Sequence, residues 1–315
     1  MNKGIDFKKL IEGDVATLAQ SITLIESSLK SDEKKANSLI KKCLKVKKQS
    51  FRICISGAPG AGKSTFINEI LNHFIKNDKK IAVLAIDPSS EKSKGSILGD
   101  KTRMSNFSNN QNIFIRPSPS KGELGGVAKK TRESIILCEK AGFEIVIIET
   151  TGVGQTEITA KKMTDFFILL TIPNSGDYLQ AIKKGVIEVA DLIIINKIDI
   201  ISNTDIEKEK NYYSQIKNNY KKIHTCSSKK NIGINNIFKI VYDNYLFQLQ
   251  NGKLHTNRIN QVEYWINKSI KENLIKKLYS QKGIQKEIKK AIEKIQENNE
   301  SIEELSIGII EKYLK

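Results

Sequence analysis

The sequence predicts a doubly wound, mostly parallel α/β sheet with helical segments before and after it. Three observations lead to this prediction: seven short apolar runs rich in Ile and Val, longer amphipathic stretches between them, and helical periodicity at both ends of the 315 residues. Strands that are apolar along their whole length are typical of sheets covered on both faces. With 39% hydrophobic residues the chain can form a core, which excludes disorder throughout.

Helical periodicity marks both ends of the chain. Apolar residues recur at helical spacing from Lys8 to about Cys43 and again after about Leu249, and Ser301 begins a Ser-x-x-Glu capping box. We expect a helical N-terminal extension at residues 1–48, a sheet domain at 49–248 and a helical arm at 249–315. The apolar stripe of the arm must pack on the sheet domain or on a second copy of the chain, which favours a dimerisation arm. Strands are expected at 53–56, 81–86, 113–115, 145–148, 166–172, 192–195 and 223–226.

The net charge of +17 does not by itself indicate a nucleic-acid partner. Only five of the 52 basic residues are Arg, and the excess is spread over the three regions as +5 in 1–50, +8 in 51–248 and +4 in 249–315. Arg is the usual reader of base edges and phosphates, whereas scattered Lys is typical of a solvated surface. We therefore expect no nucleic-acid partner.

Neither a membrane segment nor a Cys–His metal site is expected. The longest apolar runs are far shorter than the roughly 20 residues of a spanning helix, and the first 30 residues lack a signal-peptide core. Four widely spaced Cys and three His contain no paired ligand motif, which favours buried free thiols. The expected location is the cytoplasm, without a membrane partner.

A glycine-rich loop follows the first expected strand and precedes an amphipathic helix. This is the context that a phosphate-binding loop requires, because glycines let backbone N–H groups turn towards phosphates at a helix N-terminus. Lys63 is expected to bridge the β- and γ-phosphates, and the Ser64 hydroxyl to bind Mg²⁺. The G-x-x-x-x-G-K-S motif and its flank comprise Gly57, Ala58, Pro59, Gly60, Ala61, Gly62, Lys63, Ser64 and Thr65.

A second motif, Asn196-Lys197-Ile198-Asp199, follows the sixth expected strand. An Asp carboxylate accepts both N1–H and the exocyclic amine of guanine, whereas adenine would leave it unpaired. With the phosphate loop, this predicts a P-loop NTPase that prefers GTP to ATP. Ser227 and Ser228, after the last expected strand, are candidates to donate backbone N–H groups to guanine O6.

Polar segments follow three other expected strands, at the sheet edge where open α/β folds bind ligands. Asp87, Asp100 and Glu149 are candidate ligands of Mg²⁺, directly or through water, although Asp100 alone is equally well explained as a helix cap. Gly152 and Gly154 give the third segment the backbone freedom to sense a γ-phosphate. Gln155 is a candidate to orient the attacking water, or it only packs this segment.

These segments resemble the MeaB/ArgK family of G proteins over roughly residues 50–230. The likeness rests on the loop at 57–65, Asp87-Pro-Ser-Ser90, Gly95 to Met104, Arg116-Pro-Ser-Pro-Ser120 and Glu149 to Gln155. The family contains GTPase chaperones of adenosylcobalamin-dependent methylmalonyl-CoA mutase. The resemblance implies a homodimer that gates cobalamin loading and protects an acyl-CoA mutase, with the cobalamin bound by that partner.

The resemblance also implies a further switch in the loop after the fifth strand, with Asp177, Gln180 and Lys183 contacting the partner. Two residues depart from the family pattern: Tyr178 stands where an acid is usual, and Thr151 where Val is usual.

The predicted reaction is attack of water on the γ-phosphorus of GTP, with Lys63, Mg²⁺ and loop N–H groups stabilising the developing charge. Because no arginine finger is identifiable, we expect slow intrinsic hydrolysis that a partner stimulates. The main alternative is an ATPase or protein kinase associated with basic amino-acid (LAO/AO) transport. A nickel-inserting G protein would need a His- or Cys-rich segment, and a binding module that does not hydrolyse nucleotide is a further alternative.

Overall fold

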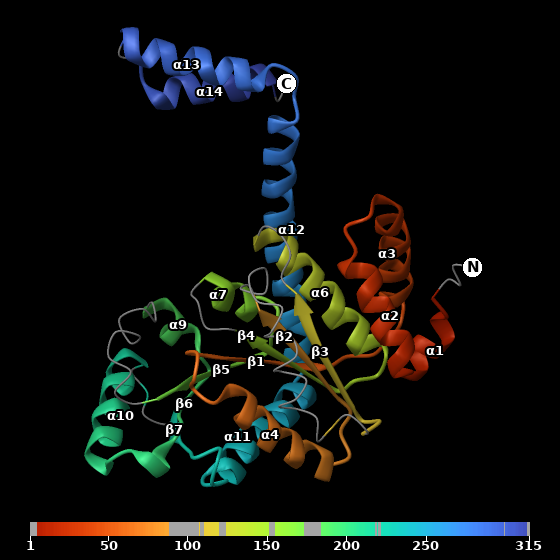
Figure 1. The fold of residues 1–315 in the computed structure, drawn as a ribbon, viewed down its shortest axis with the longest axis vertical. Coiled ribbons are helices and arrows are strands. Elements are labelled where there is room, and N and C mark those ends of the chain that lie inside the picture. Colours follow the sequence, from red (N-terminus) through yellow and green to blue (C-terminus); the bar gives the residue numbers. More distant parts are fainter. Residues whose placement is uncertain are drawn as a thin grey trace. The chain divides into compact units, whose positions relative to one another are not determined.

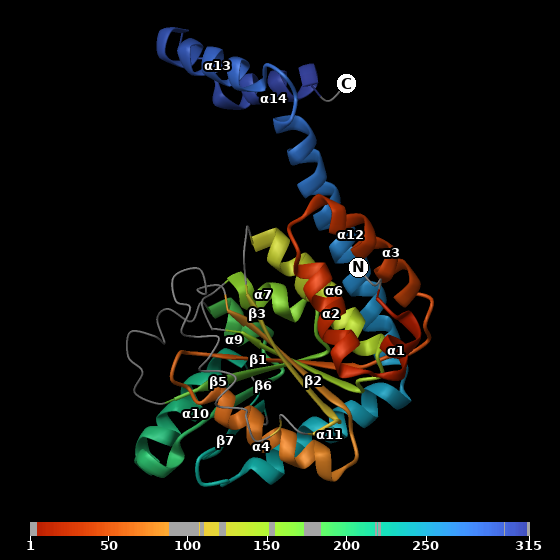
Figure 2. The same cartoon turned by 45° about the vertical axis from the view of Figure 1, so that its right-hand side comes forward.

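The computed structural model of the chain describes residues 5–87, 107, 110–119, 124–150, 155–172, 184–217, 219, 222–298 and 300–313 (Figures 1 and 2). The chain forms two compact units, Met1–His255 and Thr256–Lys315. The first unit contains the sheet with its covering helices, and the second is helical. The three-part division at residues 48 and 248 stays a prediction.

The sheet has seven strands in the order β3-β2-β4-β1-β5-β6-β7, and all of its pairings are parallel. Each strand overlaps one of the predicted apolar runs, which confirms the parallel α/β fold. The central strand β1 carries the phosphate loop at its carboxyl end. The strands are β1 (Phe51–Gly57), β2 (Ile81–Asp87), β3 (Ile113–Pro119), β4 (Ile145–Thr150), β5 (Phe166–Thr171), β6 (Leu192–Ile195) and β7 (Ile223–Thr225).

Helices cover both faces of this sheet, because alternate strand residues point to opposite sides. Ile53 and Ile55 share one buried cluster with residues of α4 (Lys63–Lys76) and α11 (Ile234–Gln250), which lie side by side (Figures 1 and 2). Cys54, between them, belongs to the opposite cluster. That second cluster includes residues of α7 (Gln155–Lys161), α9 (Lys184–Val189) and α10 (Asn203–Lys217).

Three N-terminal helices confirm the predicted helical extension: α1 (Phe7–Glu12), α2 (Val15–Glu26) and α3 (Lys30–Cys43). Asp6 and Asp14 cap α1 and α2 by accepting hydrogen bonds from Lys9 N and Thr17 N. Both α2 and α3 pack against α6 (Leu124–Lys140), which covers the sheet. The extension is therefore part of the first unit.

Polar contacts fix the end of α2 to the sheet. Arg116 on β3 forms an ion pair with Glu26, and its Nη2 also donates to Thr23 Oγ1 at 3.2 Å. Lys130 Nζ, on α6, donates to Glu26 O at 2.7 Å. The same two turns of α2 thus contact both the edge strand and the helix that covers it.

The second unit consists of most of α12 (Lys253–Tyr279), with α13 (Ile284–Asn298) and α14 (Ile302–Tyr313). The last two helices lie side by side (Figures 1 and 2), and Lys312 Nζ lies 3.1 Å from Glu287 Oε2. α14 begins directly after Ser301, where the sequence predicts a helix start. The apolar residues Ile259, Val262, Ile266, Ile270 and Leu274 form an exposed stripe along α12.

Within the described ranges, no helix combines the length and apolar character needed to cross a bilayer. Cys43, Cys54, Cys138 and Cys226 are all free and buried, as the sequence predicts. Burial raises the pKa of the Cys43 thiol to about 11 and that of Cys226 to about 12.

Candidate functional site

The phosphate loop connects β1 to α4 through positions that require glycine. Gly60 and Gly62 adopt left-handed backbone conformations, with φ of +79° and +88°. A Cβ atom on Gly62 would lie 2.6 Å from Asn196 Nδ2, whereas one on Gly60 would meet nothing within 4 Å. Glycine is therefore favoured at position 60 by the backbone conformation alone. At position 62 it is favoured both by the conformation and by the close approach of Asn196.

The charged and hydroxyl groups of the loop lie at the N-terminus of α4. Lys63 Nζ donates to Gly57 O at 2.7 Å and to Ala58 O at 3.0 Å, so the ammonium group lies inside the curve of the loop. Ser64 Oγ donates to Glu149 Oε1, at the end of β4, at 3.2 Å. Backbone N–H groups at a helix N-terminus and an adjacent ammonium group together favour a bound anion.

Asn196 joins the loops that follow β1, β6 and β7. Its side chain is buried, with Nδ2 donating to Ala61 O at 2.8 Å. Its Oδ1 accepts from both Ser228 N and Ser228 Oγ at 3.0 Å, and from Cys226 Sγ at 3.3 Å. One amide group therefore holds the phosphate loop next to the predicted base-reading loops.

Asp199 lies at the exposed side of this arrangement. Lys197 has a left-handed backbone (φ +63°), and the next residue donates Ile198 N to Cys226 O at 3.2 Å. A hydrogen bond from the Ser227 hydroxyl, with smaller contributions from the Lys230 and Lys229 charges, lowers the pKa of Asp199 below its usual value. The carboxylate is thus an anionic acceptor at neutral pH.

Several predicted site residues lie at or beyond the limits of the described side chains. The backbone of Asp87 ends β2 and that of Gln155 begins α7, and both positions are at the carboxyl edge of the sheet. The remaining predicted switch, partner and metal residues lie outside the described residues: Asp100, Gly152, Gly154, Asp177, Gln180 and Lys183. Their roles stay predictions.

Oxygen donors at this edge are compatible with Mg²⁺. In the part of the chain that the structure describes, no three His, Cys, Asp or Glu side chains gather into a metal site. The Ser64 hydroxyl and the Glu149 carboxylate nevertheless lie together beside the loop. Mg²⁺ usually takes one or two protein oxygens and completes its shell with water and substrate phosphates, so this pair fits the ion.

Two structural features of the site were not predicted from the sequence. One is the Asn196 side chain as a link between loops. The other is Glu157 on α7, 1% exposed, whose Oε1 accepts from Ser56 Oγ at 3.5 Å directly before the phosphate loop. The sequence gives a single indication of the Glu157 contact: this acid stands two residues after Gln155, in a helix that follows a glycine-containing segment.

Comparison with known proteins decides the family. The model of the family described as "Methylmalonyl Co-A mutase-associated GTPase MeaB" matches residues 18–283. The chain belongs to the MeaB family. The predicted resemblance is thereby confirmed, and it extends beyond the motif region into the helical segments on either side.

Three relatives are similar to this chain, and their names describe different roles. "GTPase ArgK" of Escherichia coli is 39% identical over 281 residues, which cover 87% of this chain and 85% of that protein. "Methylmalonic aciduria type A homolog, mitochondrial" of Mus musculus is 38% identical over 299 residues, 89% of this chain and 72% of that protein. A Caulobacter vibrioides protein named as a GTPase is 53% identical over 191 residues, but these span only 61% of this chain and 59% of that protein.

A solved structure confirms the fold across nearly the whole chain. The crystal structure of an "LAO/AO transport system kinase" superposes with a TM-score of 0.78 at 30% sequence identity. It covers 98% of this chain and 96% of that one. MeaB-family membership and the P-loop GTPase fold are therefore supported by both sequence and structure.

Proposed function

We propose that this chain binds GTP with Mg²⁺ and hydrolyses it slowly on its own. The observation that carries the proposal is the Asn196 side chain, which bonds to Ala61 in the phosphate loop and Ser228 in a base-side loop. One nucleotide bound at both loops would span this link. Family membership supports GTP as the nucleotide, since MeaB is described as a GTPase family.

The loop residues have separate roles in this proposal. Lys63 would exchange its bonds to Gly57 O and Ala58 O for bonds to β- and γ-phosphate oxygens. Ser64 and Glu149 would hold Mg²⁺, which neutralises phosphate charge when bound. Asp199 would accept the two guanine donors. The predicted backbone donation from Ser227 and Ser228 to guanine O6 would first require other bonds to break, because Ser227 N donates to Ile232 O and Ser228 N donates to Asn196 Oδ1. Gln155 remains the candidate to orient water.

Nucleotide specificity and turnover test this part directly. Phosphate release should be measured with GTP and ATP, for the wild type and for Lys63→Ala. We expect GTP to be hydrolysed in preference to ATP, and Lys63→Ala to lose the activity. Binding without any phosphate release from the wild type would instead support a module that uses nucleotide only as a conformational signal.

We further propose that the nucleotide state controls cobalamin loading and protection of an acyl-CoA mutase, which itself binds the cobalamin. The family description and the name of the mouse relative support this client class. Affinity purification from native lysate with non-hydrolysable GTP tests it. Recovery of a cobalamin-dependent mutase, and faster GTP turnover when that mutase is added, are the expected results.

A second candidate function has a specific observation in its favour. The ArgK name and the structural match to an LAO/AO transport system kinase fit a nucleotide-dependent role in basic amino-acid transport. Preference for ATP, phosphate transfer to an acceptor protein, and recovery of a transport-associated binding protein would favour it over the mutase role.

A homodimer through the C-terminal helices completes the proposal. The exposed stripe from Ile259 to Leu274 supports it, because solvent-exposed aliphatic residues on one helix face are typical of an association surface. Light scattering of the wild type and of Ile266→Glu tests it. A dimer that becomes a monomer on substitution is expected, and a monomeric wild type contradicts it.

A further inference from the structure

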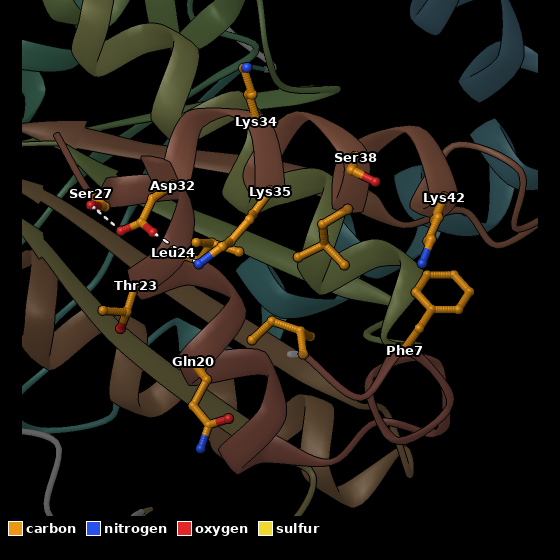
Figure 3. A pocket seen from close by; sticks show the side chains of 12 residues that line it. Phe7, Gln20, Thr23, Leu24, Ser27, Asp32, Lys34, Lys35, Ser38 and Lys42 are labelled. Atoms are coloured by element: carbon orange, nitrogen blue, oxygen red, sulfur yellow. Dashed lines mark hydrogen bonds and ion pairs between the residues drawn. The ribbon is translucent and has the colours of Figure 1, made fainter. Parts of the chain in front are cut away.

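A cavity of about 690 Å³ lies among the N-terminal helices, lined by residues of the start of the chain, α2 and α3 (Figure 3). Its lining residues belong to neither the phosphate loop nor the base-side loops. The volume is in the range of small-molecule sites, roughly 300–1,000 Å³. It is therefore large enough for a ligand of its own.

One part of the lining is apolar. Ile5, Phe7 and Leu24 are half-buried and Leu39 is buried, and these side chains come from three different segments. Covering half-buried aliphatic and aromatic side chains with an apolar ligand removes their remaining contact with water, which makes the free energy of binding more favourable. An alkyl chain can be covered on more than one side in this cavity.

The other part of the lining is cationic. Lys35 and Lys42 extend from α3 along the cavity, whereas Lys34 points away from it in Figure 3. Asp32, the one carboxylate among the described lining residues, accepts from Ser27 Oγ at 2.8 Å and pairs with Lys35 Nζ at 3.7 Å. It is thus partly compensated within the wall.

The charge around α3 is stronger than the overall average suggests. Residues 30–48 contain eight Lys against two acids, a net charge of +6, so the +5 of residues 1–50 is concentrated here. A positive surface beside a cavity raises the local concentration of anions. The cavity therefore combines an apolar wall with a cationic rim.

We propose that this cavity binds an amphipathic anion with an unbranched aliphatic chain and a carboxylate or phosphate head. A fully polar anion would leave the half-buried Phe7 and Leu24 in contact with water. A neutral lipid would supply no anionic group to Lys42, whereas Lys35 is already paired with Asp32. Only a ligand with both parts matches both walls.

Calorimetric titration of the full chain with decanoate and decyl phosphate, below their micelle concentrations, tests the proposal. We expect saturable binding at one site, tighter by roughly fourfold for each methylene added from octanoate to decanoate. The stronger of the two probes identifies the head group. Decyltrimethylammonium, with the same chain and a positive head, is the control ligand and should bind at least tenfold more weakly than decanoate.

Neighbouring lysines on α3 provide matched variants. Lys42 lines the cavity, whereas Lys41 is exposed on the same helix and is absent from the lining. Lys42→Glu should weaken decanoate binding roughly tenfold, and Lys41→Glu by less than about twofold. Lys35→Gln, expected to weaken it about threefold, is the second variant if Lys42→Glu does not fold.

The result is independent of the proposed GTPase. Binding of a fluorescent GDP analogue should be the same in all these variants, which shows that the first unit is folded. No saturable decanoate binding up to about 1 mM would overturn the proposal. Equal losses in Lys41→Glu and Lys42→Glu, or equally tight binding of decyltrimethylammonium, would also overturn it.

Discussion

Gly62→Ala would place a methyl carbon 2.6 Å from Asn196 Nδ2 in a left-handed backbone conformation. Gly60→Ala is the matched control, because Gly60 has a similar φ and nothing within 4 Å of the added carbon. The conformational cost, about 1–2 kcal/mol, is common to both. Only Gly62→Ala must also displace the Asn196 amide.

Displacing that amide has a cost that follows from its partners. Ala61 O and Ser228 N would lose their bonds to it, and a buried group left unsatisfied costs about 1–3 kcal/mol. Gly62→Ala should therefore destabilise the first unit by about 3–8 kcal/mol, against about 1–2 kcal/mol for Gly60→Ala. Urea unfolding followed by circular dichroism measures both.

A double-mutant cycle isolates the contact. In an Asn196→Ala background the clash is absent, so the extra cost of Gly62→Ala should fall to that of Gly60→Ala. Affinity for a fluorescent GDP analogue should follow the same pattern. Equal effects of Gly60→Ala and Gly62→Ala in the wild-type background would refute the role of Asn196 as a link between loops.

Three further outcomes concern the nucleotide site, and a fourth concerns a buried thiol. Lys63→Ala should lower phosphate release from GTP by about 10²–10³-fold with an unchanged circular dichroism spectrum, and a smaller loss would place the catalytic charge elsewhere. Because the pKa of Asp199 is lowered, its carboxylate stays charged down to acidic pH, so the ratio of the GDP affinities of the wild type and Asp199→Ala, in which protonation of the GDP phosphate cancels, should be constant from pH 8 to 5 and fall only below that range; a fall of this ratio within that range would contradict the assignment. Asp199→Asn should shift preference from GDP to xanthosine diphosphate, since an amide can donate to the xanthine oxygen, and competition binding measures this. Cys226, with its thiol pKa raised to about 12, should resist iodoacetamide at pH 8 until the chain is unfolded, as mass spectrometry would show.

Strands β1, β4, β5 and β6 could be predicted from the sequence because each is a largely apolar run that is buried along its length. β3 was predicted to end at residue 115 but continues to Pro119. The added part of the strand contains Pro117 and Pro119, and β3 is the edge strand, where a missing N–H donor is tolerated. The edge position of β3 depends on the order of the strands in the sheet. It cannot be recognised from the sequence of residues 113–119 alone.

The sequence predicts the candidate site only where a motif with fixed spacing is present. The loops at 57–65 and 196–199 can be recognised in the sequence because their proposed ligand-binding groups are close together along the chain. The bonds from Asn196 to Ala61 and Ser228 depend on three loops meeting at one edge of the sheet. Contacts between these loops depend on the order of the strands in the sheet, and that order is known only from the three-dimensional structure.

The central position of β1 has a consequence for how this chain folds. β1 pairs with β4 and β5, and Phe51 lies opposite Ile145, so its first partner strand is roughly 90 residues later in the chain. In the sheet, β4 lies between β1 and β2. During synthesis, β1 and β2 therefore cannot be joined into one sheet until β4 has emerged. Folding should therefore be slow and dominated by long-range pairing, and chains interrupted before residue 145 should expose apolar strand edges and aggregate.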